Sequence, residues 1–137
     1  MQEQENTRLV QQTYQSIKVG DIRSFLNSLA GDVEWELPVM KNVPFAGRWQ
    51  GCEQVGRFFD KVAEAQETLE FEPKEFIAQD DKVVVLGHFS MRIKSTGRVF
   101  SSDWAHVWTV KGGKVTRFYE YVDTAAVSGA HTAAQTG

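Results

Sequence analysis

The chain has 137 residues and a formal net charge of −3, which suits a single domain that can bury a core without disulfides or metal. Its single cysteine, Cys52, excludes an internal disulfide and a cysteine metal cluster, so the reducing cytoplasm is the expected compartment. The scattered basic residues argue against a nucleic-acid partner, and the polar segment 1–8 and the short apolar run 83–86 give no export signal or membrane span.

Two amphipathic helices are predicted at the start of the chain. Apolar side chains recur at helical spacing over residues 3–18, and Gly20 follows where a helix can end in a left-handed turn. Asp21 is a candidate N-cap for the second helix, whose apolar stripe covers residues 22–29 and which closes at residues 31–32.

A strand and a third helix are predicted next. Residues 33–37 alternate apolar and acidic side chains, which indicates a half-buried strand that Pro38 ends. A loop over residues 38–51 then leads to the third helix. The apolar stripe of this helix consists of Val55, Phe58, Phe59 and Val62.

Four long strands joined by short turns are predicted over the rest of the chain, at residues 69–79, 82–93, 99–110 and 115–123. The sequence after residue 123 is mostly Ala, Thr, Ser and Gly, which bury too little surface to fix a backbone. We therefore expect one domain over residues 1–127 and a flexible tail over residues 128–137, in which His131 has no role.

The faces of the sheet are assigned from the alternation of side chains. In residues 82–93 the odd positions are apolar and are expected to pack on the helices. A two-residue turn at 112–113 would place position 105 opposite 120 and position 103 opposite 122. Asp103, Ala105, Glu120 and Val122 would then share a face, which we take as the hollow because a ligand needs room.

The same choice sends five large side chains to the opposite, convex face: Trp104, His106, Trp108, Tyr119 and Tyr121. So large an aromatic patch is hard to leave in water, so a homodimer through this face is expected. His88 and His106 are then interface residues, and no metal site is expected because a third ligand is missing. A register shifted by one residue would instead bring His88, Trp104, His106 and Trp108 into the pocket.

Three stretches of the sequence resemble a known superfamily. Gly20-Asp21 between the first helices and the Gly-x-x-x-Val-x-x-Phe-Phe pattern of residues 51–59 resemble nuclear-transport-factor-two-like proteins. Residues 103–123 are similar to SnoaL-like and ketosteroid-isomerase-related proteins. The resemblance implies a cone-shaped α+β fold in which three helices pack on a strongly curved antiparallel sheet around a pocket. It does not fix the reaction, because isomerases, dehydratases, epoxide hydrolases, cyclases and non-catalytic proteins share this fold.

Departures from the family pattern argue against two enzyme mechanisms. The base, tyrosine and protonated acid of true ketosteroid isomerases fall on Leu37, Thr13 and Ala105. The arginine and first aspartate of limonene-epoxide-hydrolase-like proteins fall on Gly87 and Phe89, while their further aspartate matches Glu120. One acid of the second arrangement therefore remains.

Glu120 and Asp103 are the expected catalytic pair. Diagonal neighbours on adjacent strands lie about 7 Å apart, and two carboxyls near apolar side chains resist ionising together, which suits acid–base catalysis without a cofactor. The alternative is an Asp103 exposed at the rim and a Glu120 that is a satisfied buried acid.

We therefore expect a cofactor-free isomerase, lyase or hydrolase that acts on a small apolar or aromatic molecule. The alternatives are a non-catalytic binding protein and a dimerisation module whose pocket is filled by side chains. No nucleotide or metal motif is present. The expected ligand-binding residues are Thr13, Trp35, Leu37, Trp49, Phe59, Phe89, Met91, Ala105, Phe118 and Val122.

Overall fold

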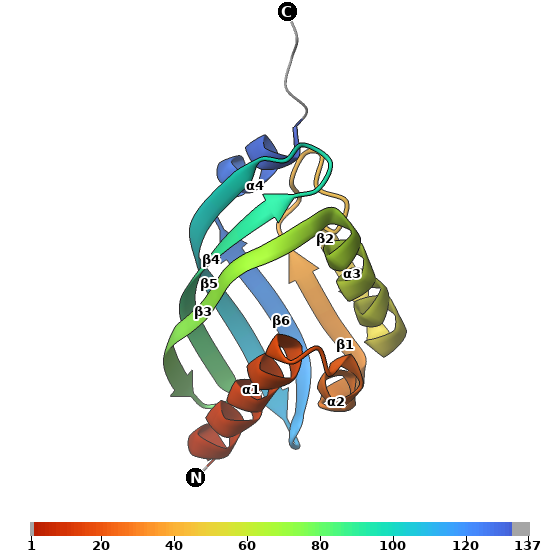
Figure 1. The fold of residues 1–137 in the computed structure, drawn as a ribbon. Helices are drawn as coiled ribbons and strands as arrows, with labels where there is room; N and C mark the ends of the chain where they lie inside the picture. The colour runs from red at the N-terminus through yellow and green to blue at the C-terminus, as the bar shows by residue number, and fades with distance from the viewer. Residues whose placement is uncertain (1, 133–137) are drawn as a thin grey trace, which may run out of the picture.

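Residues 2–132 are the part of the chain that the computed structural model describes, and they form four helices and one six-stranded sheet (Figure 1). The elements are α1 (Gln2–Lys18), α2 (Ile22–Asn27), β1 (Leu29–Leu37), β2 (Gly47–Gln50), α3 (Gly51–Ala65), β3 (Gln66–Gln79), β4 (Lys82–Ile93), β5 (Val99–Lys111), β6 (Lys114–Val122) and α4 (Thr124–His131). The α+β class predicted from the sequence is confirmed, with a fourth helix added at the end.

The strands follow the order β2-β1-β6-β5-β4-β3. All neighbours are antiparallel except β1 and β6, which pair in parallel, so the sheet is mixed and not purely antiparallel as expected. The sheet bends strongly, α1 and α3 lie over its concave side, and α4 lies at the end opposite α2 (Figure 1). The helices therefore cover part of the concave side of the sheet.

The odd-numbered side chains of β4 face the core, as the alternation predicted. Val83, Val85 and Ile93 are fully buried, and Phe89 and Met91 are nearly so. Gly87 stands in the same row because a Cβ at this position would overlap the indole ring of Trp104 and the carbonyl oxygen of Glu72. The missing side chain of Gly87 thus makes room for a tryptophan of β5.

The hairpin between β5 and β6 contains the predicted two-residue turn and one additional residue. Gly112 and Gly113 adopt φ angles of 58° and 75° between paired Lys111 and Lys114, the left-handed conformation of a type I′ turn. A bulge follows, because Val110 pairs with Val115 but Thr109 pairs with Arg117, which leaves Thr116 unopposed. Every pair beyond the bulge is shifted by one residue.

This shift overturns the predicted pairing of position 105 with position 120. Glu120 lies opposite His106, and Trp104 lies opposite Val122. Trp104, His106 and Trp108 are only 3%, 4% and 0% exposed, so they fill the concave side and do not form the predicted convex patch. Tyr119 and Tyr121 do lie on the outer face, and a homodimer through that face stays a prediction.

Three element boundaries differ from the sequence prediction. The second helix ends at Asn27, because Leu29 already pairs with Val115 of β6. The expected loop over residues 38–51 contains the short strand β2. Residues 128–131, expected in a flexible tail, continue α4, while residues 133–137 lie outside the described part of the chain.

The helix α4 forms for two local reasons. Asp123 caps its first turn by accepting a hydrogen bond from the Ala126 amide at 3.0 Å. Val127 and Ala130 are buried against the core, and His131 is buried with its Nδ1 2.9 Å from the Val127 carbonyl oxygen. This packing fixes a segment whose composition alone predicts disorder.

Candidate functional site

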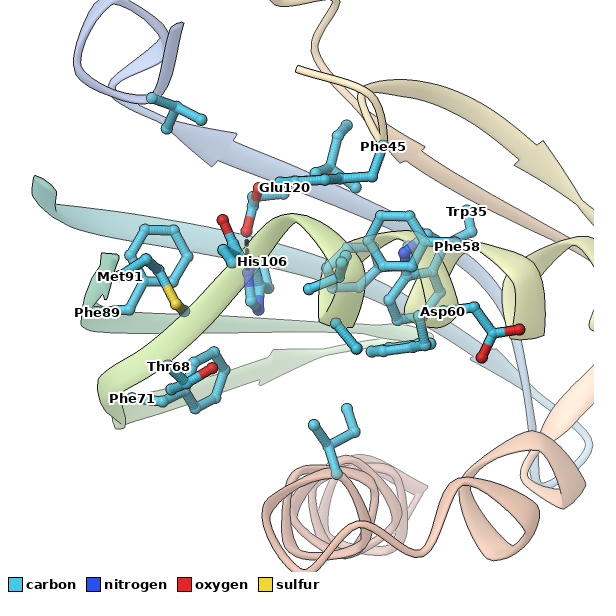
Figure 2. A pocket seen from close by; sticks show the side chains of 18 of the residues that line it. Trp35, Phe45, Phe58, Asp60, Thr68, Phe71, Phe89, Met91, His106 and Glu120 are labelled. Carbon is cyan, nitrogen blue, oxygen red and sulfur yellow. Dashed lines mark hydrogen bonds and ion pairs between the residues drawn. The ribbon is translucent and has the colours of Figure 1, made fainter. Parts of the chain in front are cut away.

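A cavity of about 870 Å³ lies between the concave side of the sheet and the helices α1 and α3. Pockets for small molecules usually measure about 300 to 1,000 Å³, so this volume can hold a ligand of several rings. Side chains do not fill the hollow, which argues against the dimerisation module as the whole function. Aromatic and aliphatic side chains form most of its wall (Figure 2).

Six of the ten expected ligand-binding residues line the cavity: Trp35, Leu37, Phe59, Phe89, Met91 and Phe118. The Trp35 and Phe118 rings, on the parallel strands β1 and β6, stack with centroids 3.8 Å apart and form a flat part of the wall.

The other four expected ligand-binding residues lie outside the lining. The Thr13 hydroxyl donates to the Val10 carbonyl oxygen within α1 at 2.6 Å. The Trp49 indole nitrogen donates to the Phe45 carbonyl oxygen at 3.1 Å. Ala105 lies on the outer face as a result of the bulge, and Val122 faces inward but does not reach the cavity.

Asp103 and Glu120 lie on opposite faces of the sheet. The Asp103 side chain is 91% exposed on the outer face, where its Oδ1 lies 2.9 Å from His88 Nδ1. Glu120 faces the cavity and its side chain is only 11% exposed. The bulge at Thr116 is the physical reason that the expected pair is separated.

Glu120 has a different partner inside the cavity. Its Oε1 lies 2.9 Å from His106 Nε2, and the His106 side chain is only 6% exposed. Figure 2 shows the two side chains meeting at the cavity wall, between Phe89 and Met91 on one side and Trp35 and Phe58 on the other. An acid and an imidazole thus replace the two acids expected from the sequence.

Two more side chains extend this pair into a hydrogen-bond chain. The Tyr14 hydroxyl lies 2.7 Å from His106 Nδ1 and 2.9 Å from Trp108 Nε1. An indole nitrogen can only donate, so the Tyr14 oxygen accepts from Trp108. Among residues 2–132 the Tyr14 hydroxyl has no other acceptor than His106 Nδ1, so we assign its hydrogen to that nitrogen. Nδ1 therefore carries no proton, and the neutral imidazole donates from Nε2 to Glu120.

The electrostatic setting agrees with a neutral imidazole. Burial lowers the pKa of His106 below its ordinary value of 6.5, and the nearby Glu120 opposes this only in part. Burial also raises the pKa of Tyr14, while its bond from Trp108 acts in the opposite direction. At neutral pH the imidazole is therefore uncharged and the phenol keeps its proton.

Aromatic stacking holds the imidazole in place. The Trp104 ring stacks on the His106 ring with centroids 3.8 Å apart and planes 15° apart. Gly87 makes this possible, since a side chain there would displace Trp104. Sequence reasoning missed His106, Tyr14 and Trp108 as one group, and the one-residue register alternative was the only signal that moved His106 and Trp108 inward.

The remaining charged lining residues lie at the rim. Lys18, Asp60, Glu67 and Lys94 are all exposed. Within residues 2–132 no group of three or more His, Cys, Asp or Glu side chains is placed to hold a metal ion. No helix of that stretch combines the length and the apolar character needed to cross a membrane.

Comparisons with known proteins match this chain over most of its length. A family model described as a SnoaL-like domain matches residues 10–118. The crystal structure of an NTF2-like protein from Burkholderia xenovorans LB400 is 36% identical, covers 95% of this chain and 98% of its own, and has a TM-score of 0.87. An NTF2-like protein of unknown function from Burkholderia pseudomallei K96243 is 29% identical over 94% of this chain and 98% of its own, with a TM-score of 0.86.

A third solved structure comes from a protein crystallised together with a small molecule. TerC, co-crystallised with polyporic acid, is 29% identical over 93% of this chain and 98% of its own, with a TM-score of 0.83. Two proteins described as putative isomerases are 18% and 14% identical and show only the shared fold. No protein with a curated description matches the chain.

Proposed function

Because the chain belongs to the SnoaL-like family, as its sequence resemblance implied, we propose that it binds a small, largely aromatic molecule in the cavity and exchanges a proton with it through Glu120. The observation that carries the proposal is a buried carboxyl, held by a neutral imidazole, at the wall of an otherwise apolar cavity. Such a group can act as a base without a cofactor.

The two oxygens of Glu120 have different tasks in this mechanism. Oε1 accepts the hydrogen bond from His106 Nε2, which fixes the direction of the carboxylate and leaves Oε2 for the ligand. Oε2 takes a proton from an acidic C–H or O–H of the ligand, and the neutral acid then returns it to another atom. His106 needs no change of protonation during either step.

The aromatic wall supports the proposed ligand class. Flat rings such as the stacked pair Trp35 and Phe118 favour aromatic ligands, because ring contacts add to the gain from apolar burial. A protein that is 29% identical to this chain was co-crystallised with polyporic acid. This supports the view that a cavity of this kind takes a small organic molecule.

One observation favours a second candidate, a binding protein without catalysis. Proton abstraction beside a carbonyl needs a donor to stabilise the oxyanion that forms. The N–H and O–H groups of His106, Tyr14 and Trp108 are all engaged with one another or with Glu120. None of these three is free to stabilise an oxyanion.

The two candidates are separated by proton exchange. We expect the wild-type protein to speed the exchange of the acidic C–H protons of 2-tetralone in deuterium oxide, followed by proton NMR. Glu120→Gln is expected to lose about 10²- to 10⁴-fold of that acceleration. Asp103→Asn, the same change on the outer face, is expected to keep it.

Equal rates for the wild type and Glu120→Gln would contradict the catalytic proposal. If neither protein speeds exchange but both bind 2-tetralone, the binding candidate is favoured. Absence of binding to this and related bicyclic ketones would count against both candidates.

A further inference from the structure

We infer that the Glu120 end of the cavity selects ligands that present a neutral hydrogen-bond donor, such as a phenol or enol hydroxyl, and discriminates against the same molecules as anions. The inference rests on the ligand-binding part of the proposed function and not on its proton transfer. It follows from the direction of each hydrogen bond around Glu120.

The direction of this hydrogen-bond chain is set at Trp108, whose indole nitrogen can only donate. Trp108 donates to Tyr14, Tyr14 donates to His106, and His106 donates to Glu120. Each donor of the three side chains is used once, and the chain ends on an acceptor. The polar atom left for a ligand is Glu120 Oε2, which accepts.

In the described part of the chain, two side chains of the lining have a buried polar atom without a partner, and neither atom changes this polarity. The Trp35 indole nitrogen is a donor without a partner among residues 2–132, but neighbouring atoms cover it completely. The Gln66 side-chain oxygen is covered in the same way and is itself an acceptor. Neither of these two atoms therefore supplies a donor to a ligand at Glu120.

The charges that face the cavity do not supply a cation near Glu120. Besides Tyr14, His106 and Glu120, the titratable groups of the lining are the exposed Lys18, Asp60, Glu67 and Lys94. The two lysines are accompanied by two acids, and Lys94 Nζ already donates to the Ala63 carbonyl oxygen at 2.7 Å. A ligand anion at Glu120 would therefore meet a carboxylate without a compensating positive charge.

The consequence is a preference that can be measured as a shift in the ligand's own pKa. A neutral phenol donates to the carboxylate in a hydrogen bond of the stronger, charge-assisted kind, while a phenolate is repelled by it in an apolar setting. We expect the neutral form to bind at least about tenfold better, which raises the pKa of the bound phenol by about one unit or more.

A coloured phenol tests this directly. The probe is 4-hydroxy-4′-nitrobiphenyl, whose phenol and phenolate absorb at different wavelengths, and the control ligand is its methyl ether, which has no donor. Absorbance titration with pH gives the pKa of the probe when free and when bound to the wild-type protein. The dissociation constants of the probe and of its methyl ether are measured at neutral pH.

Two variants complete the test. Glu120→Gln removes the charge and keeps the shape, so the rise in probe pKa is expected to shrink to a small fraction of its wild-type size. Asp103→Asn is the matched control on the outer face and is expected to leave the rise unchanged. The expected wild-type result also includes about tenfold or tighter binding of the phenol than of its methyl ether.

The outcomes separate this inference from the proposed function. If the probe and its ether both bind, but the bound phenol has an unchanged or lowered pKa, the inference is overturned while the binding site stands. If the pKa rises equally in Glu120→Gln, the inference is also overturned, because the carboxylate is not its cause. If neither ligand binds, the proposed binding function itself is contradicted.

Discussion

Replacing Tyr14 by phenylalanine is expected to destabilise the fold strongly although only one oxygen atom is lost. The Tyr14 hydroxyl accepts from Trp108 Nε1 at 2.9 Å and donates to His106 Nδ1 at 2.7 Å. Trp108 is fully buried and His106 is 4% exposed, so water cannot replace the missing oxygen without rearrangement.

The size of the effect follows from the two partners left behind. An unsatisfied buried polar group costs about 1 to 3 kcal/mol, so two of them cost roughly 2 to 6 kcal/mol. This is a large part of the typical total of about 5 to 15 kcal/mol for a domain. With a urea dependence of about 1 to 3 kcal/mol per M, the unfolding midpoint is expected to fall by at least roughly 0.7 M.

The measurement is urea unfolding followed by far-ultraviolet circular dichroism, because the tryptophan signal itself depends on Trp108. Tyr121→Phe is the matched control, since Tyr121 is 58% exposed on the outer face and surface changes usually stay within about 0.5 kcal/mol. If Tyr14→Phe destabilises no more than Tyr121→Phe, the chain of hydrogen bonds does not hold the protein as described and the tautomer assigned to His106 is unsupported.

Two further predictions concern the same wall. Burial lowers the pKa of His106 below 6.5, so just below pH 6.5 the imidazole is protonated in the unfolded chain but not in the folded one. The free energy of unfolding should therefore fall as the pH drops below about 6.5, by up to ~1.4 kcal/mol per pH unit for this group. Urea unfolding at several pH values should show that the free energy of unfolding falls less steeply below pH 6.5 for His106→Gln than for the wild type. Equal slopes would contradict the lowered pKa of His106. Gly87→Ala should destabilise by about 1 to 3 kcal/mol, because its Cβ would overlap Trp104 and Glu72. Thermal unfolding compares Gly87→Ala with Gly129→Ala, where an added Cβ meets nothing within 4 Å. Equal melting temperatures for the two variants would show that Trp104 can move aside without destabilising the fold.

The sequence predicts the fold well where the alternation of side chains is strict. In β4 every odd position from Val83 to Ile93 is apolar or glycine, which predicts that this face is buried. The structure confirms the burial of these side chains. In β5 both sets of alternate residues include apolar side chains, and the choice of face then depends on a pairing partner. Local pattern cannot supply that partner, which is why the face of β5 was assigned wrongly.

The other differences also come from contacts between distant parts of the chain. The parallel pairing of β1 with β6 joins segments that no local pattern connects, and it draws Leu29 out of the predicted helix. The α4 segment is poor in large apolar residues, and its order comes from Val127 and Ala130 packing on the core. The candidate site is subject to the same limit, because Tyr14, His106 and Glu120 come from three elements.

The bulge at Thr116 links the side chains of the cavity wall to the pairing register of a surface hairpin. If Thr116 instead paired with Thr109 and no bulge formed, Arg117, Tyr119 and Tyr121 would lie opposite Trp108, His106 and Trp104 in place of Phe118, Glu120 and Val122. The bulge therefore determines, from the surface end of the hairpin, whether the carboxyl of Glu120 or the phenols of Tyr119 and Tyr121 face the cavity.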